Sequence, residues 1–165
     1  MSVICIIQAR SGSTRFPRKI WADIRPHRMT PMLQYMLDRV LQAKRIDHVV
    51  LAVPEYDAMD AEIYIKGTIG IYGGSEKDVL DRYTMALRDF YTSRGYSSSA
   101  DSIMRLTGDC PLVDPAVLDA QIKLFHDYRL DYLGVKEFPD GLDCEIFTSS
   151  ILRAADKEAT LPSDR

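Results

Sequence analysis

The feature that most constrains the fold is the regular alternation of short apolar runs with segments of helical periodicity. The run VICII at residues 3–7 is continuously apolar, as a strand is when both of its faces are covered. Further strand-like runs follow at residues 48–53, 69–72, 102–106 and 130–135. Helical patterns lie at residues 31–44, around 58–66, 75–94, 115–128 and near 148–159. This order predicts an α/β fold in which right-handed crossovers build a mostly parallel, doubly wound sheet between two layers of helices.

Length and composition indicate an ordinary soluble protein. A chain of 165 residues is long enough for one domain with a core of its own. Its net charge of −3 argues against broad binding to nucleic acid or to a membrane surface. Cys5, Cys110 and Cys144 have neither paired nor CxxC spacing, so we expect reduced thiols and no zinc site. With no long apolar run and no secretion signal, the sequence predicts a cytoplasmic protein.

Because ligands of such sheets bind at the carboxyl ends of the strands, the loops after the strands are where a site is expected. The first of these loops, QARSGSTRFPRK at residues 8–19, gathers cations within ten residues: Arg10, Arg15, Arg18 and Lys19. Like charges this close repel unless an anion lies between them, and arginine and lysine both bind phosphate oxygens. Gly12, between two serines, allows the backbone to approach a ligand. The loop therefore predicts a polyphosphate site. A solvated basic loop is the alternative, and Arg18 is expected at the surface in either case.

Two later loops carry carboxylates. In RLTGDCPLVDP, at residues 105–115, Asp109 follows a strand, where it could hold a Mg²⁺ ion that bridges phosphates. A plain turn is the alternative for Asp109, whereas Asp114 before a proline is typical of a helix N-cap. Cys110 is expected to be a small buried residue.

The segment FPDGLDCEIF, at residues 138–147, places Asp140, Asp143 and Glu145 close together. If the chain is extended from residue 142 on, Asp143 and Glu145 lie on one face. They could then bind sugar hydroxyls, help to hold a metal or act as a base. A simple turn followed by an exposed strand is the alternative.

Taken together, QARSGSTRFPRK, GGSEKDVLDRY at residues 73–83, RLTGDCPLVDP and PDGLDCEIF resemble, in order and spacing, the cytidylyltransferase family of the spore-coat polysaccharide biosynthesis protein SpsF. That family is related to the enzymes that make CMP-sialic acid and CMP-3-deoxy-manno-octulosonate. The resemblance implies a three-layer α/β/α, Rossmann-like nucleotidyltransferase fold of the GT-A-like type. It also implies an enzyme that uses CTP and Mg²⁺ to transfer CMP to a sugar, with an acidic sugar as acceptor, and a possible homodimer.

The resemblance also assigns roles to residues of this chain. The triphosphate-binding and catalytic signature falls on Arg10, Ser13, Arg15 and Lys19, and the metal-binding aspartate falls on Asp109. Near the nucleotide it places Asp78 and Arg82, although Ser75 with Asp78 also forms an ordinary capping pair. The segment facing the acceptor sugar contains Asp140, Asp143 and Glu145.

Two departures from the family pattern stand out. Where relatives carry Gly-Lys-Pro before the first long helix, this chain has HRMTPML at residues 27–33, in which Arg28 is a candidate substitute for the lysine. Relatives also continue past the segment that matches LPSDR, into a stretch that resembles a second metal site. We therefore expect residues 1–165 to form a single nucleotidyltransferase domain that lacks the C-terminal elements of full-length relatives. Two other hypotheses remain open, a glycosyltransferase that consumes a nucleotide sugar and a truncated, non-catalytic nucleotide-binding domain.

Overall fold

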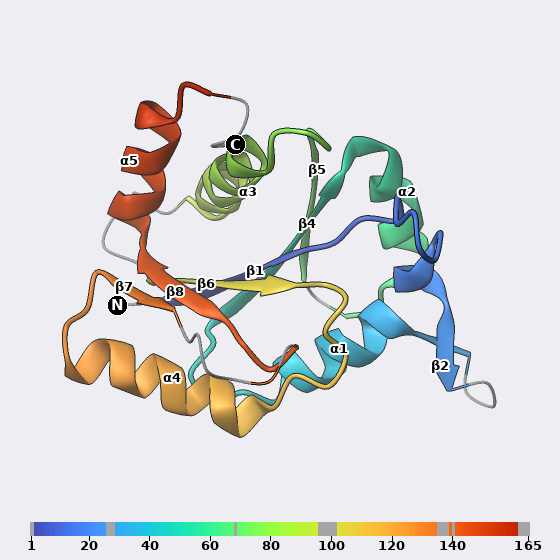
Figure 1. Ribbon diagram of the computed structural model, residues 1–165, viewed down its shortest axis with the longest axis horizontal. Helices are drawn as coiled ribbons and strands as arrows, with labels where there is room; N and C mark the ends of the chain where they lie inside the picture. Colours follow the sequence, from blue (N-terminus) through green and yellow to red (C-terminus); the bar gives the residue numbers. More distant parts are fainter. Residues whose placement is uncertain are drawn as a thin grey trace.

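The computed structural model describes residues 2–25, 29–67, 69–95, 102–134, 139 and 141–161, and its centre is a six-stranded sheet of order β5-β4-β1-β6-β8-β7 (Figure 1). Its strands are β1 (Val3–Gln8), β4 (His48–Pro54), β5 (Gly70–Gly74), β6 (Ser102–Thr107), β7 (Tyr132–Gly134) and β8 (Glu145–Thr148). The helices are α1 (Met32–Val40), α2 (Glu55–Tyr64), α3 (Val79–Arg94), α4 (Pro115–Asp127) and α5 (Ser149–Glu158).

Five of the six strands point in the same direction. β1 pairs in parallel with both β4 and β6, and β4 pairs in parallel with β5. Only β8 opposes its neighbours, since it is antiparallel to β6 and to β7. The predicted mostly parallel α/β sheet is therefore confirmed, and the carboxyl ends of β1 and β6 meet at the same edge.

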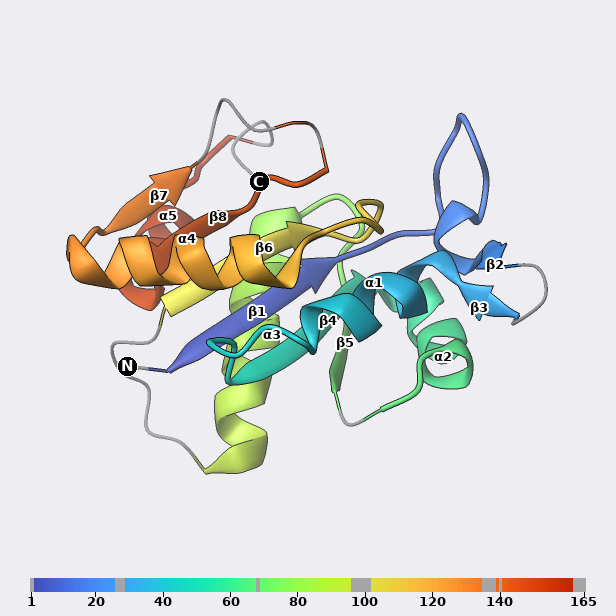
Figure 2. The same cartoon turned by 90° about the horizontal axis from the view of Figure 1, so that it is seen from below.

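Each face of the sheet carries its own apolar core. Along β1, Cys5 and Ile7 face the core formed with α1, α2 and α4, whereas Ile4 and Ile6 face the core formed with α3 and α5. Figure 2 shows α1 and α4 side by side over the first of these faces. Because β1 is covered on both sides, its sequence is a continuous apolar run rather than an alternating one.

A small hairpin that the sequence analysis did not anticipate follows the first loop. A 3-10 turn, η1 (Lys19–Trp21), leads into the antiparallel pair β2 (Asp23–Arg25) and β3 (Thr30–Pro31). Ile20 and Trp21 are buried in the core beneath this turn. These two buried side chains anchor the end of the cationic loop in the apolar core.

Several predicted boundaries shift by a few residues. The helix expected at 75–94 begins only at Val79, because Asp78 is its N-cap and accepts a hydrogen bond from the backbone N–H of Asp81. The helix expected at 31–44 ends at Val40. Cys110, predicted to be buried, is only half-buried, whereas Cys144 lies in the core. None of the helices within the described ranges is long and apolar enough to cross a membrane.

The predicted cap of α4 is present. The carboxylate of Asp114 accepts hydrogen bonds from the backbone N–H groups of Ala116 (2.8 Å) and Val117 (3.4 Å), and Pro115 occupies the first turn. These bonds satisfy donors that have no partner within the helix.

We predict that Asp114→Ala lowers the free energy of unfolding by about 1 kcal/mol, because two N–H groups at the start of α4 lose their acceptor. Urea denaturation followed by circular dichroism measures the change. Asp127→Ala, at the other end of the same helix, is the matched control and should change stability by less than about 0.5 kcal/mol, since its ion pair with Lys123 is exposed. Equal losses in the two variants would contradict the capping role.

Candidate functional site

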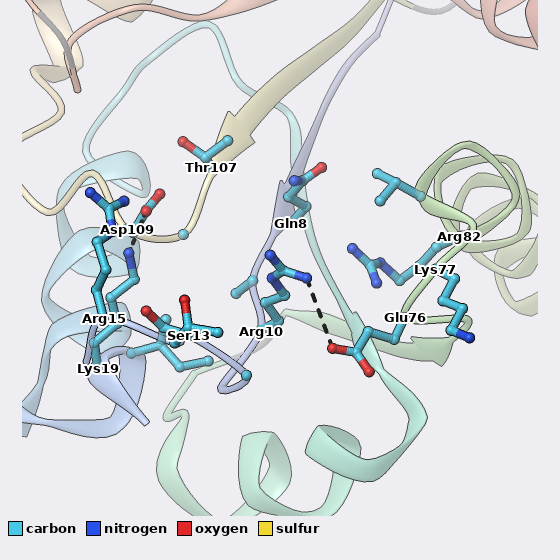
Figure 3. A pocket seen from close by; sticks show the side chains of 16 residues that line it. Gln8, Arg10, Ser13, Arg15, Lys19, Glu76, Lys77, Arg82, Thr107 and Asp109 are labelled. Atoms are coloured by element: carbon cyan, nitrogen blue, oxygen red, sulfur yellow. Dashed lines mark hydrogen bonds and ion pairs between the residues drawn. The ribbon is translucent and has the colours of Figure 1, made fainter. Parts of the chain in front are cut away.

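A cavity of about 730 Å³ opens at the edge of the sheet where β1 and β6 end (Figure 3). Segments far apart in the sequence line it: the end of β1 with the loop after it, the start of α3, and the end of β6 with the loop after it. The polar side chains of the lining are Gln8, Arg10, Ser13, Thr14, Arg15, Lys19, Glu76, Lys77, Arg82, Thr107 and Asp109. The cavity is therefore strongly polar, and cations outnumber carboxylates in its wall.

A glycine brings the loop after β6 against the end of β1. The backbone N–H of Gly108 donates to the carbonyl of Gln8 at 2.7 Å, which extends the parallel pairing by one residue. A Cβ at residue 108 would lie 2.6 Å from the Cβ of Ala9, closer than side chains can approach. Only glycine fits this position, and the close approach that it allows places the following residue, Asp109, in the lining of the cavity.

The cationic loop is held by its own backbone and by one buried carboxylate. The N–H groups of Ser13 and Arg18 both donate to the carbonyl of Ser11, at 2.8 and 2.9 Å. The N–H of Ser11 in turn donates to the carboxylate of Asp57 at 2.8 Å, and Asp57 is buried at the start of α2. Sequence analysis missed Asp57, because an aspartate in the first turn of a helix has an ordinary reason to be there.

Lys19 and Asp109 form the central ion pair of the cavity. The Lys19 ammonium lies 2.6 Å from the Asp109 carboxylate, and both side chains are partly exposed. This hydrogen bond is the largest cause that holds the pKa of Asp109 below its ordinary value. The aspartate is thus an anion at neutral pH, as a metal ligand must be.

The opposite wall is built by α3 and the turn before it. Arg10 lies 3.8 Å from the carboxylate of Glu76. The side chain of Arg82 is buried, and its Nη1 donates to the carbonyl of Ser75 at 2.7 Å while its Nε is buried without a hydrogen-bond partner. Burial lowers the pKa of this guanidinium. A buried cation with an unused donor is well suited to bind an anionic or polar ligand group.

The predicted nucleotide residues thus separate into two groups. Arg10, Ser13, Arg15, Lys19 and Asp109, which come from two loops, share one cavity with Arg82. By contrast, Lys77 and Val79 line the cavity but Asp78, which lies between them in the sequence, does not. The carboxylate of Asp78 caps α3 instead. Arg18, expected at the surface, pairs with Asp60 at 2.7 Å and does not line the cavity.

The predicted acceptor residues lie beside this cavity rather than in it. Asp143 and Glu145 line an adjoining pocket of about 250 Å³, which shares Thr107 with the large cavity. Glu145 forms an ion pair with Arg105 and accepts a hydrogen bond from the hydroxyl of Tyr132 at 2.7 Å. Burial opposes ionisation of Glu145, but these hydrogen bonds outweigh it and lower its pKa. Asp140 and Arg28 lie outside the described residues.

The donor set suits a magnesium ion that is shared with a ligand. Within the ranges that the structure describes, no group of three or more His, Cys, Asp or Glu side chains could hold a metal ion by itself. Mg²⁺ is commonly bound through one or two carboxylates together with phosphates and waters. Asp109, ionised and partly exposed beside the cationic loop, fits that mode of binding.

Comparison with known proteins places these features in a family. A model of the family described as Cytidylyltransferase matches residues 4–161. The spore coat polysaccharide biosynthesis protein SpsF of Bacillus subtilis is 34% identical over 157 residues, which make up 91% of this chain and 60% of that protein. The chain thus spans about three fifths of the length of this curated relative.

Solved structures agree with the sequence comparison. A cytidylyltransferase from Leptospira borgpetersenii superposes with a TM-score of 0.83 at 36% identity, over 100% of this chain and 68% of that one. The CMP:2-keto-3-deoxy-manno-octonic acid synthetase, solved with CTP, shares the fold with a TM-score of 0.73 at 15% identity, over 99% of this chain and 81% of that one. The predicted nucleotidyltransferase fold and the resemblance to the SpsF family are confirmed, and the chain belongs to the cytidylyltransferase family.

Proposed function

We propose that this protein transfers CMP from CTP to a hydroxyl group of a sugar and releases pyrophosphate. The observation that carries the proposal is that Arg10, Arg15, Lys19 and Asp109 line one cavity at the carboxyl ends of β1 and β6. Several cations beside one ionised carboxylate are the combination that a triphosphate with its magnesium ion requires. Membership of the cytidylyltransferase family supports CTP as the nucleotide.

Each residue has a role that follows from its place. Arg15 and Lys19 bind the β- and γ-phosphates, and Arg10 binds the α- or β-phosphate, while Ser13 adds a hydroxyl donor from the same loop. Asp109 would hold the Mg²⁺ ion, which when bound neutralises charge on the phosphates. Lys19 forms an ion pair with Asp109, so its ammonium would have to turn from the carboxylate to the phosphate oxygens for Asp109 to hold the metal.

The reaction is an in-line displacement at the α-phosphorus of CTP. A bond forms between the acceptor oxygen and the α-phosphorus, the bond to the bridging oxygen of the β-phosphate breaks, and the hydroxyl proton passes to solvent water. The protein contributes by positioning the reactants and by neutralising the charge that builds up on the phosphates.

For the acceptor, the resemblance favours an acidic sugar used for a surface polysaccharide or glycan. Asp143 and Glu145 line the pocket that adjoins the nucleotide cavity, and Glu145 also lines the cavity between α3 and α5, so a sugar in that region can donate hydrogen bonds to it.

We predict that Arg15→Ala and Asp109→Asn each lower the rate of pyrophosphate release from CTP plus sugar by at least about a hundredfold. The expected loss is comparable to the removal of one donor that stabilises transition-state charge. Arg18→Ala is the matched control, because it removes an equal charge from the same loop at a residue paired with Asp60 outside the cavity. Near-normal turnover of the Arg15 or Asp109 variant would contradict the proposed mechanism.

A second prediction distinguishes the three candidate functions. CTP with Mg²⁺, at about 100 times its dissociation constant, should stabilise the folded protein by about 2.7 kcal/mol, which differential scanning fluorimetry detects as a rise in Tm. Stabilisation by a nucleotide sugar and not by CTP would favour a glycosyltransferase. Stabilisation by CTP without pyrophosphate release from the same sample would favour a non-catalytic nucleotide-binding domain.

The ion pair of Lys19 and Asp109 makes a prediction about pH. Since Lys19 lowers the pKa of Asp109, the pair stabilises the folded state above the ordinary aspartate pKa, and this contribution is lost as the pH falls through the lower, folded value. In Lys19→Met the pKa of Asp109 should rise toward its ordinary value, as measured by a carboxyl ¹³C NMR titration. An unchanged pKa would show that Lys19 does not hold the carboxylate in solution.

A further inference from the structure

A second large cavity lies on the same face of the sheet as α3 and α5. Its volume, about 570 Å³, is within the range of roughly 300–1,000 Å³ that is usual for small-molecule sites. One wall consists of apolar side chains from the first turn of α3 and from α5: Val79, Leu80, Ile151, Leu152 and Ala155. Figure 1 shows these two helices side by side above the strands.

The opposite side of this cavity is polar. It presents the ion pair of Arg105 and Glu145, together with Tyr132, whose hydroxyl donates to the same glutamate. Arg105 and Glu145 are register partners on β6 and β8, so the sheet fixes their spacing. Guanidinium donors beside carboxylate acceptors can bind adjacent hydroxyls of a sugar, while the apolar wall suits a deoxy or acylated part of the same molecule.

The two large cavities share part of their lining. Gln8, the last residue of β1, and Val79, the first residue of α3, line both. An in-line transfer requires the attacking oxygen to lie about 3–3.5 Å from the phosphorus. With a nucleotide in one cavity and an acceptor in the other, the reacting atoms would have to meet where Gln8 and Val79 border both.

Of the two residues at this boundary, Gln8 is the one with a polar side chain. It follows Ile4 and Ile6 on the face of β1 that packs under α3, at the point where the apolar core ends. In Figure 3 its amide lies between Thr107 and Arg82. The amide oxygen is buried without a hydrogen-bond partner, so no other described residue holds the side chain through that atom, and the side chain lines both cavities.

We propose that the acceptor sugar binds in the cavity between α3 and α5, and that the amide nitrogen of Gln8 donates a hydrogen bond to an oxygen of the α-phosphoryl group at the boundary of the two cavities. The inference rests on the proposed function and adds the acceptor site and a catalytic residue to it. As the bond from the acceptor oxygen forms and the bond to pyrophosphate breaks, charge builds up on the α-phosphoryl oxygens, where a fixed donor is most effective. Gln8 neither gains nor loses a proton, because the hydroxyl proton passes to water.

Two substitutions of Gln8 test the donor role. The assay measures pyrophosphate release with CTP, Mg²⁺ and a panel of neutral, deoxy, N-acetylated and acidic sugars, and calorimetry measures CTP binding. Gln8→Leu should lower kcat about a hundredfold with less than a threefold change in the Kd of CTP. Gln8→Glu, which replaces the donor by a carboxylate that repels phosphate, should lose at least as much. Gln42→Leu, an exposed glutamine at the end of α1, is the matched control and should retain full activity.

A third variant tests the acceptor cavity without touching the nucleotide site. Ala155→Trp fills the cavity from α5, so it should raise the KM of the sugar at least tenfold while CTP binding is retained. Normal kcat in Gln8→Leu, retained activity in Gln8→Glu, or an unchanged sugar KM in Ala155→Trp would overturn the inference. So would a wild-type protein that binds CTP but uses no sugar of the panel. Failure of the wild type to bind CTP would overturn the proposed function itself, and this inference with it.

Discussion

The parallel pairing of β1 with β6 is the interaction on which the candidate site depends. It carries two loops from distant parts of the sequence to one edge of the sheet, and the hydrogen bond from Gly108 to Gln8 fixes their separation. The absence of a side chain at residue 108 allows the loop of Asp109 to lie directly against Ala9. A cationic loop and a carboxylate that are ninety residues apart, as Lys19 and Asp109 are, become hydrogen-bonded neighbours as a result.

The charged side chains of the site differ in whether they have an ion-pair partner. Near β6 the aspartate and the lysine compensate each other, whereas Arg15 has no ion pair among the described residues and Arg82 is buried beside a backbone carbonyl. In the first loop Arg10, Arg18 and Lys19 each lie beside a carboxylate, so Arg15 is the cation of that loop left to attract an external anion, among the residues that the structure describes. In the adjoining region Arg105 and Glu145 are already paired, so that side of the molecule offers hydrogen bonds more than net charge.

The sequence was informative where the local chemistry has few alternatives. An uninterrupted apolar run such as that of β1 indicates a strand that is covered on both faces. Asp114 directly before Pro115 is typical of a helix N-cap. The convergence of the loops at residues 8–19 and 107–109 followed from the rule that parallel strands end at one edge.

Other features could not be predicted, because they depend on tertiary contacts, which produce no recognisable pattern of residues in the sequence. Asp57 holds the cationic loop from another helix, and its sequence context is that of an ordinary first-turn aspartate. For Asp78 the sequence left a place near the nucleotide and a capping pair with Ser75 both open, and the structure shows its carboxylate accepting from the backbone N–H of Asp81. Gln8 is inconspicuous in the sequence, since only the packing of α3 and α5 reveals that it lies between two cavities.

Residues at the start of α3 line both of those cavities. Successive residues of a helix point about 100° apart, so Arg82 lines the cavity beside the cationic loop while Tyr83, its immediate neighbour, lines the cavity between α3 and α5. A small rotation of α3 about its axis would therefore widen one compartment as it narrows the other. One helix thus forms part of the wall of both cavities, so a substitution that displaces α3 would alter the two together.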